Sequence, residues 1–97
     1  MTTLQTLKAA REKITDPLRW TQGTWARDVQ GWPVERDGDA ACWCAWGAVT
    51  SVKAGVGAEL AACDELHKSA GGSFIAFNDT HTHAEVLALF DKAIATL

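Results

Sequence analysis

The sequence lacks the features of a membrane or exported protein. It contains no tyrosine, only two prolines and one methionine, and no apolar run near the length of a membrane-spanning helix, which needs about 20 residues. Its polar start, MTTLQTLKAAREK, has no apolar centre of the kind that secretory signals carry. These absences favour a cytoplasmic protein that makes no membrane contact and folds as a single domain over residues 1–97.

An excess of positive charge is also missing. Nine Lys and Arg residues stand against twelve Asp and Glu residues, giving a net charge of −3. Binding to a nucleic-acid backbone requires a basic surface, so nucleic acid is not an expected partner. The 47% hydrophobic and 22% charged residues are typical of a chain that folds into a globular core.

The three cysteines give no basis for a disulfide framework. An odd number leaves one thiol unpaired, and nothing in the sequence indicates export to an oxidising compartment. We therefore expect reduced thiols.

The apolar pattern predicts a mainly helical α+β fold, with about four helices packed around a buried central helix and a short β-hairpin between the first two helices. The expected helices are Thr2–Thr15, Ala40 to about Lys53, Ala58–Ala70 and Thr82–Leu97. The hairpin strands are expected at Thr24–Val29 and Trp32–Arg36, around a turn at Gln30-Gly31.

Four local signals refine this prediction. Asp39 is suited to cap the central helix, whose residues 40–49 are apolar on all sides, and Gly47 within it predicts a close approach of another backbone. Thr82 and Glu85 have the spacing of a capping box, which predicts the start of the last helix. The short apolar patch Phe74–Phe77 suits an extended segment.

All five tryptophans lie between residues 20 and 46. Trp43 and Trp46 fall in the expected central helix and are interpreted as core residues. Trp20, Trp25 and Trp32 fall in the expected loop and hairpin, where tryptophan marks binding surfaces as often as packing. They are the candidate binding residues, with a protein as the partner and a homodimer among the alternatives.

A zinc site is one alternative that the cysteines and histidines leave open. Cys63 and His67 lie four residues apart and would share a helix face, with Cys42 or Cys44 and a histidine completing a tetrahedral set. Against this, the two sulfurs of a Cys-x-Cys pair on a helix point about 200° apart. No metal or other cofactor is therefore the main expectation.

A nucleophilic cysteine is a second alternative. Cys42 or Cys44 lies in the first turns of the expected central helix, where the dipole favours thiolate. His81 or His83 would supply the base, and Asn78 or Asp79 the orienting group. The Asn78-Asp79 pair is otherwise explained as a turn. The corresponding site would be Cys44 with Asn78 and Asp79.

Five short segments carry a resemblance to a known family. They are Trp-Thr-Gln-Gly (Trp20–Gly23), Ala-Arg-Asp (Ala26–Asp28), Trp-Cys-Ala-Trp-Gly-Ala-Val (Trp43–Val49), Phe-Asn-Asp (Phe77–Asp79) and Ala-Glu-Val-Leu-Ala-Leu-Phe-Asp-Lys-Ala (Ala84–Ala93). This order resembles a family of short bacterial and phage proteins of unknown function, with a Cys-Ala-Leu-Gly-Ala core and a Trp-Asn-Asp turn before the terminal helix. The resemblance implies a fold and a phage-like setting without a mechanism.

The chain departs from that pattern at two apolar positions. Trp46 stands where the family prefers leucine, and Phe77 stands where it prefers tryptophan. The cysteines and histidines without a counterpart in the pattern are Cys42, Cys63, His67, His81 and His83, which weakens the zinc alternative.

Together these features predict a small non-enzymatic accessory protein, of phage or prophage type, that acts by contact with another protein. A cysteine-dependent hydrolase or transferase centred on Cys44 and a zinc-stabilised module are the alternatives. Whether the Cys44 sulfur is open to solvent or sealed among apolar groups distinguishes the first two, and we expect it sealed.

Overall fold

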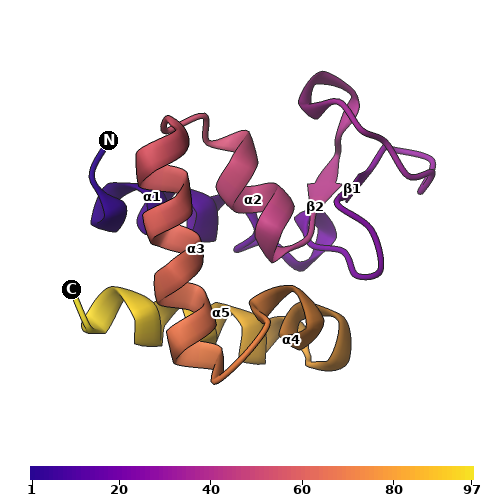
Figure 1. Ribbon diagram of the computed structural model, residues 1–97. Helices are drawn as coiled ribbons and strands as arrows, with labels where there is room; N and C mark the ends of the chain where they lie inside the picture. The colour runs from indigo at the N-terminus through magenta and orange to yellow at the C-terminus, as the bar shows by residue number, and fades with distance from the viewer.

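The computed structural model describes all residues from 1 to 97 and contains five α-helices and one two-stranded antiparallel sheet (Figure 1). The helices are α1 (Thr3–Lys13), α2 (Ala45–Ser51), α3 (Val56–Ala70), α4 (Phe74–Thr80) and α5 (His83–Ala95). The strands are β1 (Ala26–Arg27) and β2 (Cys42–Trp43), and two short 3-10 turns cover Pro17–Arg19 and Asp37–Asp39. The predicted class, mainly helical α+β with a small sheet between α1 and α2, is confirmed.

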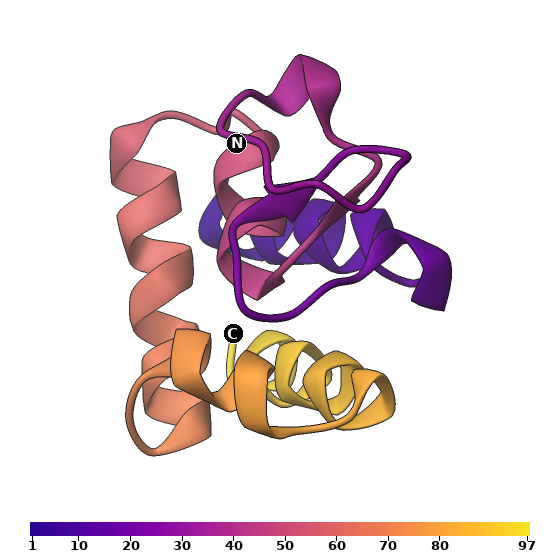
Figure 2. The ribbon, with the colours of Figure 1, turned by 90° about the vertical axis from the view of Figure 1, so that its right-hand side faces the viewer.

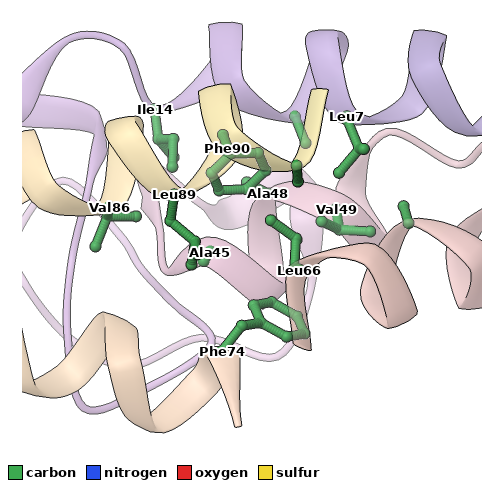
Figure 3. Close-up of a cluster of buried hydrophobic side chains, with 13 residues drawn as sticks. Leu7, Ile14, Ala45, Ala48, Val49, Leu66, Phe74, Val86, Leu89 and Phe90 are labelled. Atoms are coloured by element: carbon green, nitrogen blue, oxygen red, sulfur yellow. The ribbon is translucent and has the colours of Figure 1, made fainter. Parts of the chain in front are cut away.

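The hydrophobic core lies where α1, α2, α3 and α5 meet, with α4 contributing one ring (Figure 3). Its buried side chains are Leu7, Ala10, Ile14, Ala45, Ala48, Val49, Ala62, Leu66, Phe74, Val86, Leu89, Phe90 and Ala93. Alanines at the helix contacts allow close approach, and Phe74 and Phe90 fill the largest volumes. As predicted, the central helix α2 is buried on most of its surface.

The sheet and its loops gather at one end of the molecule, away from α3 (Figure 1). Viewed from that end, the loops lie in front of α2, and α4 runs beside them (Figure 2). None of the helices combines the length and apolar character needed to cross a bilayer.

The predicted helices corresponding to α1, α3 and α5 are confirmed, with ends that differ from the predicted ones by at most two residues. Thr82 caps α5, and its backbone N–H donates to the Glu85 carboxylate at 2.9 Å in a capping box. This hydrogen bond lowers the pKa of Glu85. Thr2 and Gln5 form the same arrangement at α1, and Gly71 ends α3 in the left-handed conformation.

The predicted start of the central helix at Ala40 is wrong, since α2 begins at Ala45 and its cap is Cys44 instead of Asp39. The preceding residues are strand β2, in which Trp43 pairs with Ala26 of β1. The N–H of Cys44 donates to the carbonyl of Trp25 at 3.0 Å. Hydrogen bonds to a segment distant in sequence thus outweigh the local helical pattern.

The predicted second hairpin strand, Trp32–Arg36, is wrong as a regular strand. Only one isolated bridge, between Arg27 and Pro33, and a hydrogen bond from the N–H of Val34 to the carbonyl of Ala26 connect it to β1. Pro33 has no N–H to continue the ladder. The main partner of β1 is β2 instead.

The prediction of an extended segment at Phe74–Phe77 is also wrong, since these residues begin α4. Ser73 caps the helix by accepting a hydrogen bond from the N–H of Ala76 at 3.2 Å. Phe74 and Asn78, four residues apart, then face the interior together. This placement makes Asn78 part of the candidate site described below.

Candidate functional site

Asn78 is fully buried, and its side-chain amide uses every hydrogen-bonding position that it has. Its Oδ1 accepts from the Trp20 indole at 2.7 Å and from the N–H of Ala45 at 3.0 Å. Its Nδ2 donates to the Thr21 carbonyl at 3.0 Å and to Asp79 at 3.2 Å. The amide therefore joins α4, the start of α2 and the loop after α1.

Two further contacts attach that loop to α4. The N–H of Gly23 donates to Asp79 Oδ1 at 2.8 Å, and the Gln22 side chain donates to the carbonyls of Asn78 and His81. The Trp-Thr-Gln-Gly and Phe-Asn-Asp segments of the sequence thus meet in space. Their side chains have a structural reason to occur together.

Gly47 marks the closest approach of two segments in the site. A Cβ at this position would lie 2.2 Å from the carbonyl oxygen of Trp25, so only glycine fits. This confirms the close backbone approach that the sequence predicted. The Trp25 indole then lies along α2 and donates to the Thr50 hydroxyl at 2.7 Å.

Trp25 and Trp46 together line two hollows on this face. The smaller hollow, of about 170 Å³, is lined by Gly23, Thr24, Trp25, Cys44, Trp46, Ile75 and Asp79. The larger, of about 360 Å³, is lined by Trp25, Glu35, Trp46 and Thr50. Trp46 is 41% exposed and Ile75 is 38% exposed. We call Trp25, Trp46 and Ile75 with these two hollows the tryptophan surface.

Cys44 lies at the edge of the smaller hollow and is only 4% exposed. Its Sγ accepts a hydrogen bond from the N–H of Gly47 at 3.3 Å, as the cap of α2. Burial raises the pKa of this thiol and the charge of Asp79 adds to the rise, whereas the backbone N–H groups of Gly47 and Trp46 oppose it. No histidine lines the hollow to act as a base.

The predicted nucleophilic set is therefore brought together only in part. Cys44 and Asp79 line one hollow, but the Asn78 amide is fully engaged in the interior. His83 lies 2.6 Å from the carbonyl of Ile14, and His81 stacks on Phe77. A thiol held neutral by burial is a poor nucleophile.

The predicted zinc ligands are not gathered. Burial, with the charges of Glu59 and Asp64, raises the pKa of Cys63 to about 11, and His67 Nδ1 lies 3.2 Å from the N–H of Phe74. No group of three or more His, Cys, Asp or Glu side chains is placed to share a metal ion. The Sγ of Cys42 faces the carbonyl of Arg27.

The three predicted binding tryptophans occupy different environments. Trp20 is half-buried and donates to Asn78, Trp25 is half-buried within the tryptophan surface, and Trp32 is 66% exposed on the loop after β1. Their binding role stays a prediction.

Trp46 and Ile75 were missed as candidate surface residues. A helix that starts at Ala40 places Trp46 in its middle, whereas the observed start places it in the first turn, where it faces outward. The signal that the sequence does carry is the run Cys-Ala-Trp-Gly, in which a cysteine caps a helix and the glycine three residues later accommodates another backbone.

Comparison with family models places this architecture among proteins without an assigned activity. The chain belongs to a family of unknown function, DUF6197, whose model matches residues 1–96. Comparison with curated proteins and with solved structures gives no significant match.

Proposed function

We propose that this protein is a small non-enzymatic accessory protein that binds another protein through the tryptophan surface. The observation that carries the proposal is the exposure of Trp46 beside Trp25 and Ile75, where two hollows open next to a fixed indole. Tryptophans in such positions supply much of the binding energy in protein interfaces.

The rigidity of this surface supports a binding role. The indole of Trp25 is fixed by its hydrogen bond to Thr50 and by its contact with Gly47, so little side-chain freedom is lost when a partner binds. Below it, the Asn78 amide anchors the start of α2. A partner would thus meet a preformed shape.

The chemistry of Cys44 favours binding over catalysis. Cys44 lines the smaller hollow but is only 4% exposed, and burial raises the pKa of its thiol. It also fulfils a structural task as the cap of α2. The phage or prophage setting and the cytoplasmic location are part of the proposal, and the resemblance of the sequence segments supports the phage-like setting.

A capture experiment tests the proposal. The chain is immobilised, exposed to an extract of the source cells, and compared with Trp46→Ala and with Leu60→Ala, which alters a side chain that is 60% exposed on α3. We expect Trp46→Ala to capture at least tenfold less protein than the unaltered chain, and Leu60→Ala to capture as much. Equal capture by both variants, with unchanged circular dichroism, would contradict the proposal.

A further inference from the structure

We infer that the smaller hollow of the tryptophan surface receives an arginine side chain of the partner, with its guanidinium over an indole and beside the Asp79 carboxylate. The inference rests on the proposed function, because it names the chemical group that the surface recognises. Three observations carry it: the lining of the hollow, the fixed position of Asp79, and a similar contact inside the protein.

The lining combines indole rings with negative charge. Trp25 and Trp46 border both hollows, with Asp79 at the smaller and Glu35 at the larger, and no Lys, Arg or His lines either one. A cation near the face of an indole is attracted by the negative face of the ring. A carboxylate at the same hollow adds a charge-assisted hydrogen bond.

Asp79 is held in position before any partner arrives. Its Oδ1 accepts from the N–H of Gly23 at 2.8 Å and from Asn78 Nδ2 at 3.2 Å, while its Oδ2 makes no hydrogen bond within the chain. The residue is exposed. One oxygen therefore fixes the carboxylate and the other is available to a donor from outside.

Arg27, which lies beside Gly23, does not satisfy this site. If Gly23 carried a Cβ, that atom would lie 3.8 Å from Nη2 of Arg27. The Arg27 guanidinium, however, donates to the Thr21 hydroxyl and to the carbonyls of Gln22 and Gly31. It is thus committed to the loop that it supports.

The protein itself already contains a contact of this kind between partly buried side chains. The Lys13 ammonium lies 4.7 Å from the centroid of the Trp43 ring and 3.9 Å from the Asp37 carboxylate, and the Trp43 indole donates to the same carboxylate at 3.0 Å. Cation, indole and carboxylate are there supplied by one chain. The smaller hollow presents the indole and the carboxylate to the outside.

Arginine fits better than lysine for a physical reason. A guanidinium is planar, so it can stack on an indole while its edge donates to a carboxylate, and it is more weakly hydrated than an ammonium. Moving a guanidinium from water into a half-buried hollow therefore costs less free energy than moving an ammonium.

The experiment uses NMR of the indole N–H groups of the intact chain, titrated with end-blocked Gly-Arg-Gly and with its neutral counterpart, in which citrulline replaces arginine. We expect saturable shifts of the Trp25 and Trp46 signals with the arginine peptide and none with the citrulline peptide. Asp79→Asn keeps an oxygen for the Gly23 N–H and removes the charge, so it should weaken binding at least fivefold. Glu12→Gln, which removes the same charge at an exposed site on α1, should not change it.

Absence of arginine-dependent shifts, equal shifts with citrulline, or undiminished binding by Asp79→Asn would each overturn the inference. The capture experiment with Trp46→Ala tests the proposed function independently of the arginine site. If capture depends on Trp46 while the arginine peptide fails to bind, the surface recognises another group and the proposed function stands. If the peptide binds while capture ignores Trp46, the arginine site is real and the proposed function is wrong.

Discussion

At the scale of single residues, the buried amide of Asn78 connects three segments that are distant in the sequence. It satisfies two donors, the Trp20 indole and the N–H of Ala45, and two acceptors, Thr21 and Asp79. The sequence pointed to Asn78 as a residue of interest but offered a local turn as its simplest role. The contacts lie 57 and 58 residues away for Thr21 and Trp20, and no local pattern contains that information.

Replacing Asn78 by Ala should destabilise the fold strongly. Two buried N–H groups would lose their acceptor, and each such loss costs about 1–3 kcal/mol, so we expect a decrease in the free energy of unfolding of about 3–5 kcal/mol. Urea denaturation measures it, with Thr80→Ala as the control at an exposed position of the same helix. A loss below about 1 kcal/mol would mean that water replaces these hydrogen bonds.

Gly47 offers a second test at this scale. In an ordinary helix, Gly→Ala stabilises by up to about 1 kcal/mol, but here the added Cβ would overlap the Trp25 carbonyl, so we expect Gly47→Ala to destabilise by at least about 2 kcal/mol. Gly57→Ala in α3 is the matched control, because a Cβ there meets no atom within 4 Å. Thermal unfolding of both variants should show shifts of opposite sign. A stabilised Gly47→Ala variant would contradict the close approach.

At the scale of elements, the sequence predicts those whose signals are local. Capping residues and apolar periodicity locate α1, α3 and α5 with small errors at their ends, since the Thr82 and Glu85 capping box and Gly71 act within one turn. The start of α2 could not be found this way. It depends on the pairing of β2 with β1, in which the paired residues lie 15 and 17 positions apart in the sequence.

In the candidate site, too, some features are visible in the local sequence and others depend on tertiary packing. That Asn78 and Asp79 follow an apolar patch is visible in the sequence, but the approach of Asp79 to Cys44 and Trp46 depends on how α4 packs beside α2. The exposure of Trp46 depends on a helix boundary that is itself set by tertiary contacts. Surface and core tryptophans therefore cannot be separated by composition alone.

The cap of α2 gives a prediction about the thiols. Burial raises the pKa of Cys44 above the ordinary value of a cysteine thiol, so the thiol stays protonated at neutral pH and should react slowly with iodoacetamide. In single-cysteine variants, we expect labelling of Cys44 to be at least tenfold slower than labelling of Cys42. The labelling rate of Cys44 should keep rising with pH beyond the point where an ordinary thiol is fully deprotonated, because burial raises the pKa of Cys44. A midpoint near or below pH 7 would revive the hydrolase alternative.

The raised pKa values of the Cys44 and Cys63 thiols predict how the stability of the fold depends on pH. A thiol with a higher pKa in the folded state stabilises the fold fully below its unfolded pKa, and this contribution is lost as the pH rises through the folded pKa. For Cys63 the window runs from pH 9 to about 11. Denaturation across that range should show a smaller decline in Cys63→Ser than in the unaltered chain. An identical decline would contradict the raised pKa of Cys63.

At the scale of the whole molecule, the helices and the loops have separate tasks. The core is formed by α1, α2, α3 and α5, and the loops around β1 and β2 lie at one end of the molecule (Figure 1). Contacts of Asn78 and Gly47 attach these loops to the helices. The tryptophan surface lies at this junction. Its position there is our physical reason for regarding it as the functional face.

Photo-crosslinking from this surface tests the central claim most directly. A benzophenone amino acid at position 75 leaves Trp25 and Trp46 intact and lines the smaller hollow, and the same group at position 60 on α3 is the control. After irradiation in an extract of the source cells, we expect one discrete protein adduct from position 75 and none from position 60. The absence of an adduct at position 75, or the same adducts from both positions, would contradict the account that this protein acts through its tryptophan surface.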